Sequence, residues 1–197
     1  MKILIDNGHG ENTPGKCSPD KRLREYKWAR ECAELLCAKL KNMGYDAERI
    51  VTEEWDVPLS ERCKRVNSIC KKHGSKNCLL VSIHNNAAGA DGKWHTAKGW
   101  SVFVSKNASA RSKILAECLL NQVKIAGVEY RVPAPNQSYW VQNLAICRDT
   151  NCAAVLTENL FQDNKEDVDY LLSDAGMSLL VDLHAKGIAA YIKTIGG

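Results

Sequence analysis

The sequence predicts an α/β protein of one domain, residues 1–197, in which a twisted, mostly parallel (mixed) β-sheet is flanked by helices. Short apolar segments alternate with segments of helical periodicity along the chain, which is typical of layered α/β folds. One apolar run, residues 78–83, is continuous, as expected for a strand that is buried on both faces of a sheet. No repeat, linker or shift in composition marks a second domain, and 197 residues suit one core.

The first half of the chain is expected to form two strand–helix units and a central strand. A loop rich in Gly, Pro and Asn, residues 7–20, follows the first strand. Gly44 and Gly74 each stand just past a helical pattern, where glycine commonly ends a helix. These signals place strands at residues 2–6, 45–51 and 78–83, and helices at about 23–43 and 58–73.

The second half continues the alternation with less regular spacing. A polar loop, residues 84–98, follows the central strand, and Pro133 and Pro135 interrupt a mixed segment. Gly127 stands past another helical pattern. We expect strands at residues 99–105 and 153–157, and helices at residues 109–126 and 174–192.

Composition and charge exclude several classes of function. The net charge of +4 is mild, and no dense Lys/Arg stripe or nucleic-acid motif is present, so we expect no nucleic-acid partner. No run approaches the roughly 20 apolar residues that span a bilayer, so we expect no membrane insertion. Only residues 3–5 are apolar between Lys2 and Asp6, so we expect no signal peptide and synthesis in the cytoplasm.

Three polar side chains follow predicted strands. His9 comes just past the first strand, His84 directly follows the central strand, and Glu158 directly follows the last one. In open α/β sheets, sites form at the carboxyl ends of the strands. We therefore expect two imidazoles and a carboxylate to meet at one edge of the sheet.

Glu25 is the fourth candidate. The inward stripe of the first helix is expected to contain Ala29, Cys32, Leu36, Leu40 and Met43. Four residues before Ala29 the pattern reaches Glu25. A carboxylate thus occupies a position where the pattern requires an apolar residue, and buried carboxylates are costly unless they are paired or metal-bound. The alternative is a first-turn Glu that only complements the helix dipole.

His9, His84 and Glu25 together match a common catalytic zinc set. Zinc prefers tetrahedral coordination by nitrogen and oxygen, and a catalytic site keeps its fourth position for water. An unligated carboxylate nearby can transfer protons, which is the role expected of Glu158. Each histidine taken singly would more often be structural, and it is the joint arrangement that predicts one Zn²⁺ per chain.

With these residues aligned, the chain resembles the zinc-dependent N-acetylmuramoyl-L-alanine amidases of the type-3 family, the catalytic domains of autolysins and phage endolysins. Residues 6–10 (Asp-Asn-Gly-His-Gly) resemble the family's Asp-Pro-Gly-His-Gly, and residues 82–87 (Ser-Ile-His-Asn-Asn-Ala) its Ser-Ile-His-x-Asn-Ala. Residues 99–103 resemble its Gly-Val-Glu-Val-Tyr, and residues 144–158 its Leu-x-Val-Leu-Arg and Pro-Ala-Val-Leu-Val-Glu. Asn7, Ala153 and Thr157 depart from the family pattern without removing a candidate ligand.

The resemblance implies a peptidoglycan hydrolase that cleaves the amide bond between N-acetylmuramic acid and L-Ala of the stem peptide. It implies attack by zinc-bound water, with Glu158 as general base and then general acid. It places Arg148 on the family arginine, where it either stabilises the oxyanion or holds the peptide stem, unless it forms only a structural salt bridge. Asn86 is expected either to orient the loop of His84 or to contact the substrate, and His95 is expected to contact the substrate.

Other polar and aromatic residues are given structural or open roles. His73 and His184 are expected not to be ligands. Trp94, Tyr139 and Trp140 either stack on sugar or pack, and Trp100 is expected to pack. The nine cysteines are odd in number and include no CxxC pair, so we expect them to be reduced. Cys17 is either a bystander or an oxidation-sensitive thiol near the site.

Three alternatives stay open, and the resemblance also bears on partners and location. The alternatives are another zinc peptidase acting on wall stem peptides, a non-catalytic peptidoglycan-binding module and, last, a cysteine amidase, for which no suitable thiol is evident.

The expected partner is peptidoglycan, and we expect a monomer with no separate wall-binding domain. Without a signal peptide, action on the cell wall requires release by a holin or by lysis.

Overall fold

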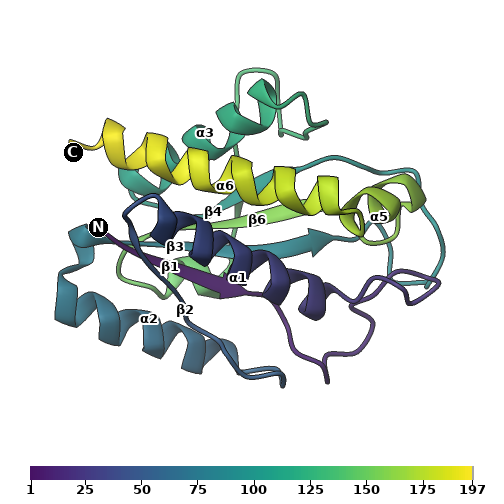
Figure 1. Cartoon of the computed structure of the whole chain (residues 1–197), viewed down its shortest axis with the longest axis horizontal. Helices are drawn as coiled ribbons and strands as arrows, with labels where there is room; N and C mark the ends of the chain where they lie inside the picture. Colours follow the sequence, from purple (N-terminus) through teal and green to yellow (C-terminus); the bar gives the residue numbers. More distant parts are fainter. Residues whose placement is uncertain (197) are drawn as a thin grey trace.

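Six strands form one mixed sheet in the computed structural model, which describes residues 1–196 (Figure 1). The order across the sheet is β2-β1-β3-β6-β4-β5. The first four strands in this order are mutually parallel, whereas β4 runs antiparallel to β6 and parallel to β5. This confirms the predicted mostly parallel, mixed sheet. The strand bounds are β1 (Lys2–Asn7), β2 (Asp46–Arg49), β3 (Cys78–Asn86), β4 (Ser101–Ser105), β5 (Trp140–Gln142) and β6 (Ala153–Phe161).

Helices cover both faces of the sheet. On one face α1 and α3 each pack against α6, and on the other face lie α2 and the short α4 (Figure 1). A 3-10 turn, η1 (Ser75–Asn77), leads from α2 into β3. The helix bounds are α1 (Glu25–Asn42), α2 (Leu59–His73), α3 (Ala110–Ile125), α4 (Ala145–Arg148), α5 (Lys165–Leu171) and α6 (Asp174–Thr194).

The sheet separates two hydrophobic cores, and β3 contributes to both. Its residues Leu79, Val81 and Ile83 pack into the core under α1, α3 and α6, while Cys78 and Leu80 pack into the core under α2. Side chains alternate between the faces of a strand, so a strand covered on both faces needs apolar residues at every position. This explains why the run 78–83 is continuous.

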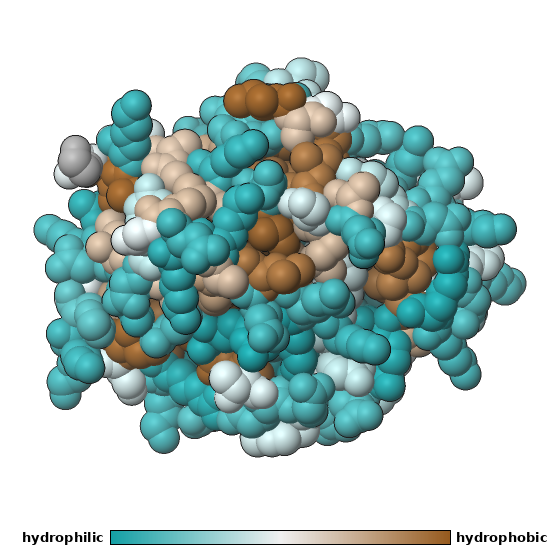
Figure 2. All heavy atoms as spheres, in the orientation of Figure 1, coloured by the Kyte–Doolittle hydropathy of each residue, from teal (hydrophilic) through white to brown (hydrophobic). Residues whose placement is uncertain are grey.

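Close helix packing on the first face depends on a small residue. A Cβ at Gly187 of α6 would lie 2.7 Å from the side chain of Leu119 in α3, so glycine allows the two helices to approach. On the same face, hydrophobic patches lie between hydrophilic side chains (Figure 2). None of the helices in the described part of the chain combines the length and apolar character needed to span a membrane.

The structure corrects several predicted bounds. The predicted strands 78–83 and 153–157 are both too short. In the structure β3 continues to Asn86 and β6 continues to Phe161. His84 and Glu158 therefore lie within strands and not directly after them. Polar residues interrupt the apolar pattern there, but backbone pairing between the two strands continues. β5, α4 and α5 were not predicted, because segments this short show no clear periodic pattern.

Candidate metal centre

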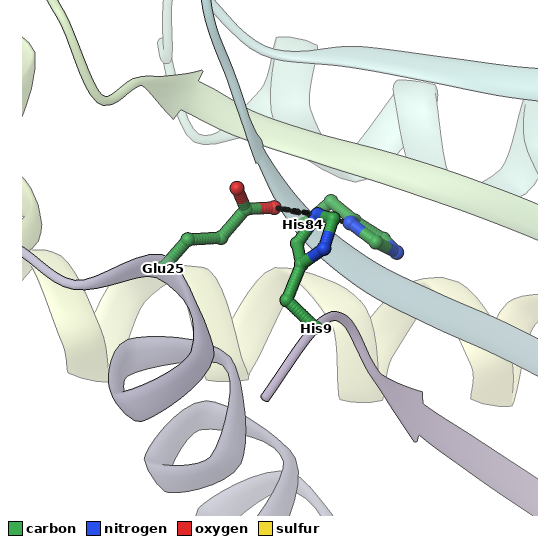
Figure 3. Close-up of side chains that lie close together, drawn as sticks. All are labelled: His9, Glu25 and His84. Carbon is green, nitrogen blue, oxygen red and sulfur yellow. Dashed lines mark hydrogen bonds and ion pairs between the residues drawn. The ribbon is translucent and has the colours of Figure 1, made fainter. Parts of the chain in front are cut away.

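Two histidines and one glutamate from three separate segments converge near the carboxyl ends of β1 and β3 (Figure 3). His9 lies two residues past β1, Glu25 is the first residue of α1, and His84 lies near the end of β3. One ligand-type atom from each residue lies within 4.8 Å of the other two. The structure thus brings together the three residues that the sequence predicted as metal ligands.

Glu25 is a carboxylate with only 1% of its surface exposed. Its Oε1 lies 3.3 Å from His9 Nε2 and 3.0 Å from His84 Nδ1, and it accepts a hydrogen bond from the backbone N–H of Asn85. Burial alone would raise the pKa of Glu25, but the hydrogen bonds and charges of His84 and His9 outweigh burial and hold this pKa well below its usual range. Its Oε2 is buried with no hydrogen-bond partner among residues 1–196. A bound cation would satisfy this oxygen, so the donor set fits zinc.

The His84 ring occupies space that only a glycine leaves open. A Cβ at Gly8 would lie between 2.2 and 2.7 Å from three atoms of this ring. The Nε2 of His84 lies 3.1 Å from the Ser82 hydroxyl, which donates a hydrogen bond to Asp6 at 2.5 Å. These contacts orient the ring so that its Nδ1 faces Glu25. Although burial opposes it, the hydrogen bond and charge of Glu25 raise the pKa of His84.

Two arginines hold the turn that contains His9. Neither of them was predicted from the sequence to belong to the site. The carbonyl oxygen of His9 accepts hydrogen bonds from Arg62 of α2 and Arg30 of α1. Both arginines are buried. In the sequence, the burial of Arg62 is indicated only by its position next to Cys63, beside the apolar stripe of α2.

Glu158 lies beside His84 because the parallel strands β3 and β6 pair these two residues in register. Its Oε2 is buried and has no hydrogen-bond partner in the described part of the chain. Burial raises the pKa of Glu158 to about 7, with the charge of His84 opposing the shift and that of Glu25 adding to it. The geometry thus provides a carboxyl group next to the three candidate ligands that can exchange a proton near neutral pH.

Side-chain amides tie β3 to β6 behind these residues. Asn159 donates a hydrogen bond to the backbone carbonyl of His84 at 3.0 Å, and its own side-chain oxygen accepts one from Trp100 Nε1 at 2.9 Å. Asn85 donates to the backbone carbonyl of Asn159 at 2.7 Å. Trp100 is fully buried, as the sequence predicted. These bonds fix the two strands where they carry His84 and Glu158.

A cavity of about 440 Å³ lies against His9 and His84. Asp6 and Arg62 contribute to its wall, but they are paired with each other at 2.7 Å. Most of its wall is apolar and comes from the loop before α2, the segment 144–146 and β6. The cavity can therefore accept an uncharged group next to the candidate metal ligands. Its apolar lining residues are Val57, Pro58, Leu59, Leu144, Ala145, Ile146 and Leu156.

Arg148, Asn86 and His95 lie outside this cluster of ligands. The exposed guanidinium of Arg148 pairs with Asp149 at 2.6 Å and does not line the cavity, which supports the salt-bridge alternative. Asn86 ends β3, and its side-chain oxygen accepts a hydrogen bond from the next backbone N–H. His95 Nε2 lies 2.9 Å from Asp91 in the loop after β3. Their roles toward substrate stay predictions.

The remaining histidines, aromatic residues and thiols are placed as follows. His184 is fully buried between the Leu180 carbonyl and the Thr157 hydroxyl, and burial lowers the pKa of His184 to about 4. His73 ends α2. Trp140 stacks on Phe103, Tyr139 packs against the core under α6, and Trp94 is exposed. All nine cysteines are free thiols and six are buried, while Cys17 is half-buried.

Known proteins match this chain over almost its whole length. The family model of N-acetylmuramoyl-L-alanine amidases of type 3 matches residues 3–190. The endolysin of Bacillus phage SPP1 is 26% identical over 194 residues, which cover 96% of this chain and 65% of the endolysin. The N-acetylmuramoyl-L-alanine amidase CwlM of Bacillus licheniformis is 26% identical over 191 residues, covering 96% of this chain and 68% of CwlM.

A solved structure shows the same fold. The crystal structure of an N-acetylmuramoyl-L-alanine amidase from Clostridium difficile 630 matches with a TM-score of 0.83 at 24% identity, covering 100% of this chain and 98% of that chain. This chain spans about two thirds of the length of the phage endolysin and of CwlM. The match of the family model over almost the whole sequence is decisive: the chain belongs to the type-3 N-acetylmuramoyl-L-alanine amidase family.

Proposed function

We propose that this protein is a zinc-dependent peptidoglycan hydrolase that cleaves the amide bond between N-acetylmuramic acid and L-Ala of the stem peptide. The observation that carries the proposal is the cluster of His9, Glu25 and His84 with the buried carboxyl group of Glu158 beside it. Family membership supports the choice of substrate.

His9, Glu25 and His84 are proposed to hold one Zn²⁺. When bound there, zinc polarises the substrate carbonyl and lowers the pKa of a coordinated water. Asn85 holds Glu25 through its backbone N–H, and Ser82 holds His84 through its hydroxyl, so both ligand side chains are oriented before a metal arrives. We propose no other metal for the site.

Glu158 is proposed to move the protons of the reaction. As the carboxylate it accepts a proton from the attacking water, and as the acid it delivers this proton to the nitrogen of the departing L-Ala. In the metal-free chain the pKa of Glu158 is about 7, so this group can both accept and release a proton near neutral pH. Glu158 is held by β6 within reach of the site because it pairs with His84 across the strands.

The cavity beside His9 and His84 is proposed to receive the substrate. Its apolar wall excludes water from the reacting amide, which strengthens the electrostatic interactions there. Asn86 and His95 remain proposed substrate contacts at the loop after β3. Arg148 remains a proposed contact to the peptide stem, although its pairing with Asp149 favours a structural role.

Mass spectrometry of digested peptidoglycan tests the proposed activity. We expect the protein to release free amino ends of L-Ala and to leave the glycan strands intact. A chelator should abolish cleavage, and added zinc should restore it. New ends elsewhere in the stem peptide would favour a zinc peptidase, and binding without cleavage would favour a wall-binding module.

A pair of variants tests the role of Glu158. We expect Glu158→Gln to slow cleavage by about 10²–10⁴-fold, the usual range for a lost general acid–base group, while still binding one zinc. Glu166→Gln serves as the control, because Glu166 is exposed on α5. A Glu158→Gln protein that binds zinc and cleaves at the wild-type rate would contradict the assignment.

Action on the cell wall follows from the proposed substrate. Synthesis in the cytoplasm, release by a holin or by lysis, and a monomeric state remain predictions from the sequence. Fractionation of producing cells, followed by size-exclusion chromatography of the purified protein, would test all three.

A further inference from the structure

His9 has a backbone conformation that needs outside support. Its φ is 60°, in the left-handed region that residues other than glycine rarely adopt. Such a conformation persists only where the surrounding structure holds it in place. Because His9 is a candidate metal ligand, the groups that hold its backbone also decide where its imidazole lies.

A single guanidinium, that of Arg62, binds the whole turn that carries His9. Its Nη2 donates a hydrogen bond to the His9 carbonyl at 3.0 Å, and its Nη1 donates to the Asn7 carbonyl at 2.6 Å and to Asp6 Oδ1 at 2.7 Å. The remaining bonds go to the loop before α2, with Asp56 Oδ1 at 3.0 Å and the Val57 carbonyl at 2.8 Å. The Arg62 side chain is only 2% exposed. The guanidinium therefore links the end of β1, the His9 turn and the loop that borders the cavity.

The same guanidinium also reaches the second histidine through a short relay. Asp6 accepts one hydrogen bond from Arg62 and another from the Ser82 hydroxyl at 2.5 Å. Since the Ser82 hydrogen is used in this bond, the Ser82 oxygen accepts from Nε2–H of His84 at 3.1 Å. The relay leaves His84 Nδ1 facing Glu25. Arg62 thus supports both imidazoles without touching either ring.

Arg30 adds a second donor from the other side of the sheet. Its Nη1 donates to the His9 carbonyl at 3.2 Å and to the Tyr26 carbonyl at 3.1 Å. Arg30 belongs to α1, the helix that begins with Glu25. The His9 carbonyl is therefore held jointly by α2 and by the helix that carries the third candidate ligand.

We propose that Arg62 is a positioning residue for the metal site, which sets the left-handed turn of His9 and the orientation of His84. The inference rests on the proposed zinc site. Lysine cannot replace Arg62 in this role, since an ammonium group lacks the planar fork that reaches several acceptors at once. The charge of Arg62 is needed to pair with Asp6, but the fork is needed to place the ligands.

The test compares Arg62→Lys with Arg65→Lys. Arg65 lies one turn further along α2 and binds Glu53 and the Ile50 carbonyl, but it makes no contact with the His9 turn. Zinc affinity is measured by competition with a chelator. Amide hydrogen exchange is measured on the metal-free protein for the peptide that contains Gly8, whose N–H donates to the Ile83 carbonyl.

We expect Arg62→Lys to weaken zinc binding by about 10–100-fold, the usual loss when a residue supporting a metal ligand is changed, and to speed exchange at the His9 turn. We expect Arg65→Lys to change neither quantity, even where it lowers the melting temperature. A purely structural role for Arg62 would lower the melting temperature and leave zinc affinity and local exchange at wild-type values. That result would overturn the inference.

Two further outcomes keep the test decisive. If Arg62→Lys does not fold in buffer alone, it is compared with the wild type and with Arg65→Lys in a stabilising osmolyte, and unchanged zinc affinity and exchange of the folded variant would then overturn the inference. If the wild-type protein itself binds no zinc, the proposed function fails. In that case the exchange measurement alone decides whether Arg62 holds the His9 turn.

Discussion

At the scale of single residues, Gly8 and Glu158 both adjoin the candidate ligand His84. Gly8 leaves the space that the His84 ring fills, and Glu158 lies beside the same ring on the neighbouring strand. Neither residue is a candidate ligand. Both lie so close to one that their size or charge decides whether the site can form.

We predict that Gly8→Ala weakens zinc binding by at least about tenfold, because its Cβ would lie 2.2 Å from a ring atom and displace His84. Competition with a chelator measures the affinity. Gly92→Ala is the control for zinc affinity, since its φ of 69° strains alanine only locally and a Cβ there would meet nothing within 4 Å. Wild-type affinity in the Gly8→Ala protein would show that the ring has another place to go.

We predict that Glu158→Gln raises the free energy of unfolding of the metal-free protein relative to the wild type, and that this gain grows as the pH rises. The pKa of Glu158 is about 7 in the folded chain against an ordinary 4.5, so between these values folding takes up a proton and the wild type loses stability with rising pH. Glutamine has no such dependence. The difference in free energy of unfolding between the variant and the wild type should grow by up to about 3 kcal/mol from acidic pH to about pH 8.

Urea unfolding in the presence of a chelator measures this difference at several pH values. Glu166→Gln should show no comparable growth, because Glu166 is exposed. A difference that stays constant across the pH range would mean that Glu158 titrates normally and is not desolvated.

At the scale of elements, the site depends on how helices and strands approach one another. The register of β3 and β6 brings His84 and Glu158 together, and the packing of α1 against α6 and β3 places Glu25. α3 and α6 also pack closely, but on a part of the molecule that carries no candidate ligand. Stability and metal binding can therefore be separated by changing this contact.

We predict that Gly187→Ala destabilises the fold by about 1–3 kcal/mol, the usual cost of overpacking, and leaves zinc affinity unchanged. A Cβ at Gly187 would lie 3.0 Å from the Leu119 backbone and closer still to its side chain. Denaturant unfolding measures the first effect and chelator competition the second. Lys186→Ala, on the exposed side of α6, is the control. A loss of zinc affinity would mean that α6 transmits strain to the site.

For the whole molecule, the proposed metal links distant parts of the chain. Residue 9 lies in the turn after β1, whereas residues 25 and 84 belong to α1 and β3. A zinc ion bound to all three would hold these parts of the chain together. A ligand that binds only the folded state stabilises it by mass action.

We predict that free zinc at about 1,000 times its dissociation constant stabilises the fold by about 4 kcal/mol, which raises the melting temperature by roughly 10 °C. Calorimetry with zinc and with a chelator measures the shift. His84→Ala should abolish it, while Glu158→Gln should keep it because Glu158 is not a proposed ligand. An unchanged shift in His84→Ala would place zinc elsewhere.

The sequence by itself determined the fold class, the main helices and strands, and the four central residues of the candidate site. Apolar runs and helical periodicity are local patterns, so β3 and α1 can be recognised without knowing what covers them. Glu25 was predicted as a ligand from the inward phase of its helix together with the resemblance to the family, because helical phase alone also allows a charge at a helix end. The motifs around His9 and His84 led to the family that the comparison confirmed.

Only the tertiary structure decided the contacts between segments far apart in the chain. Arg62 binds acceptors more than fifty positions away, at Asp6, Asn7 and His9, and no local pattern encodes such a set. The register of Glu158 with His84 likewise arises from backbone pairing, which continued through residues whose polarity suggested a loop. A sequence pattern reports which face a side chain prefers, whereas packing decides which groups it meets there.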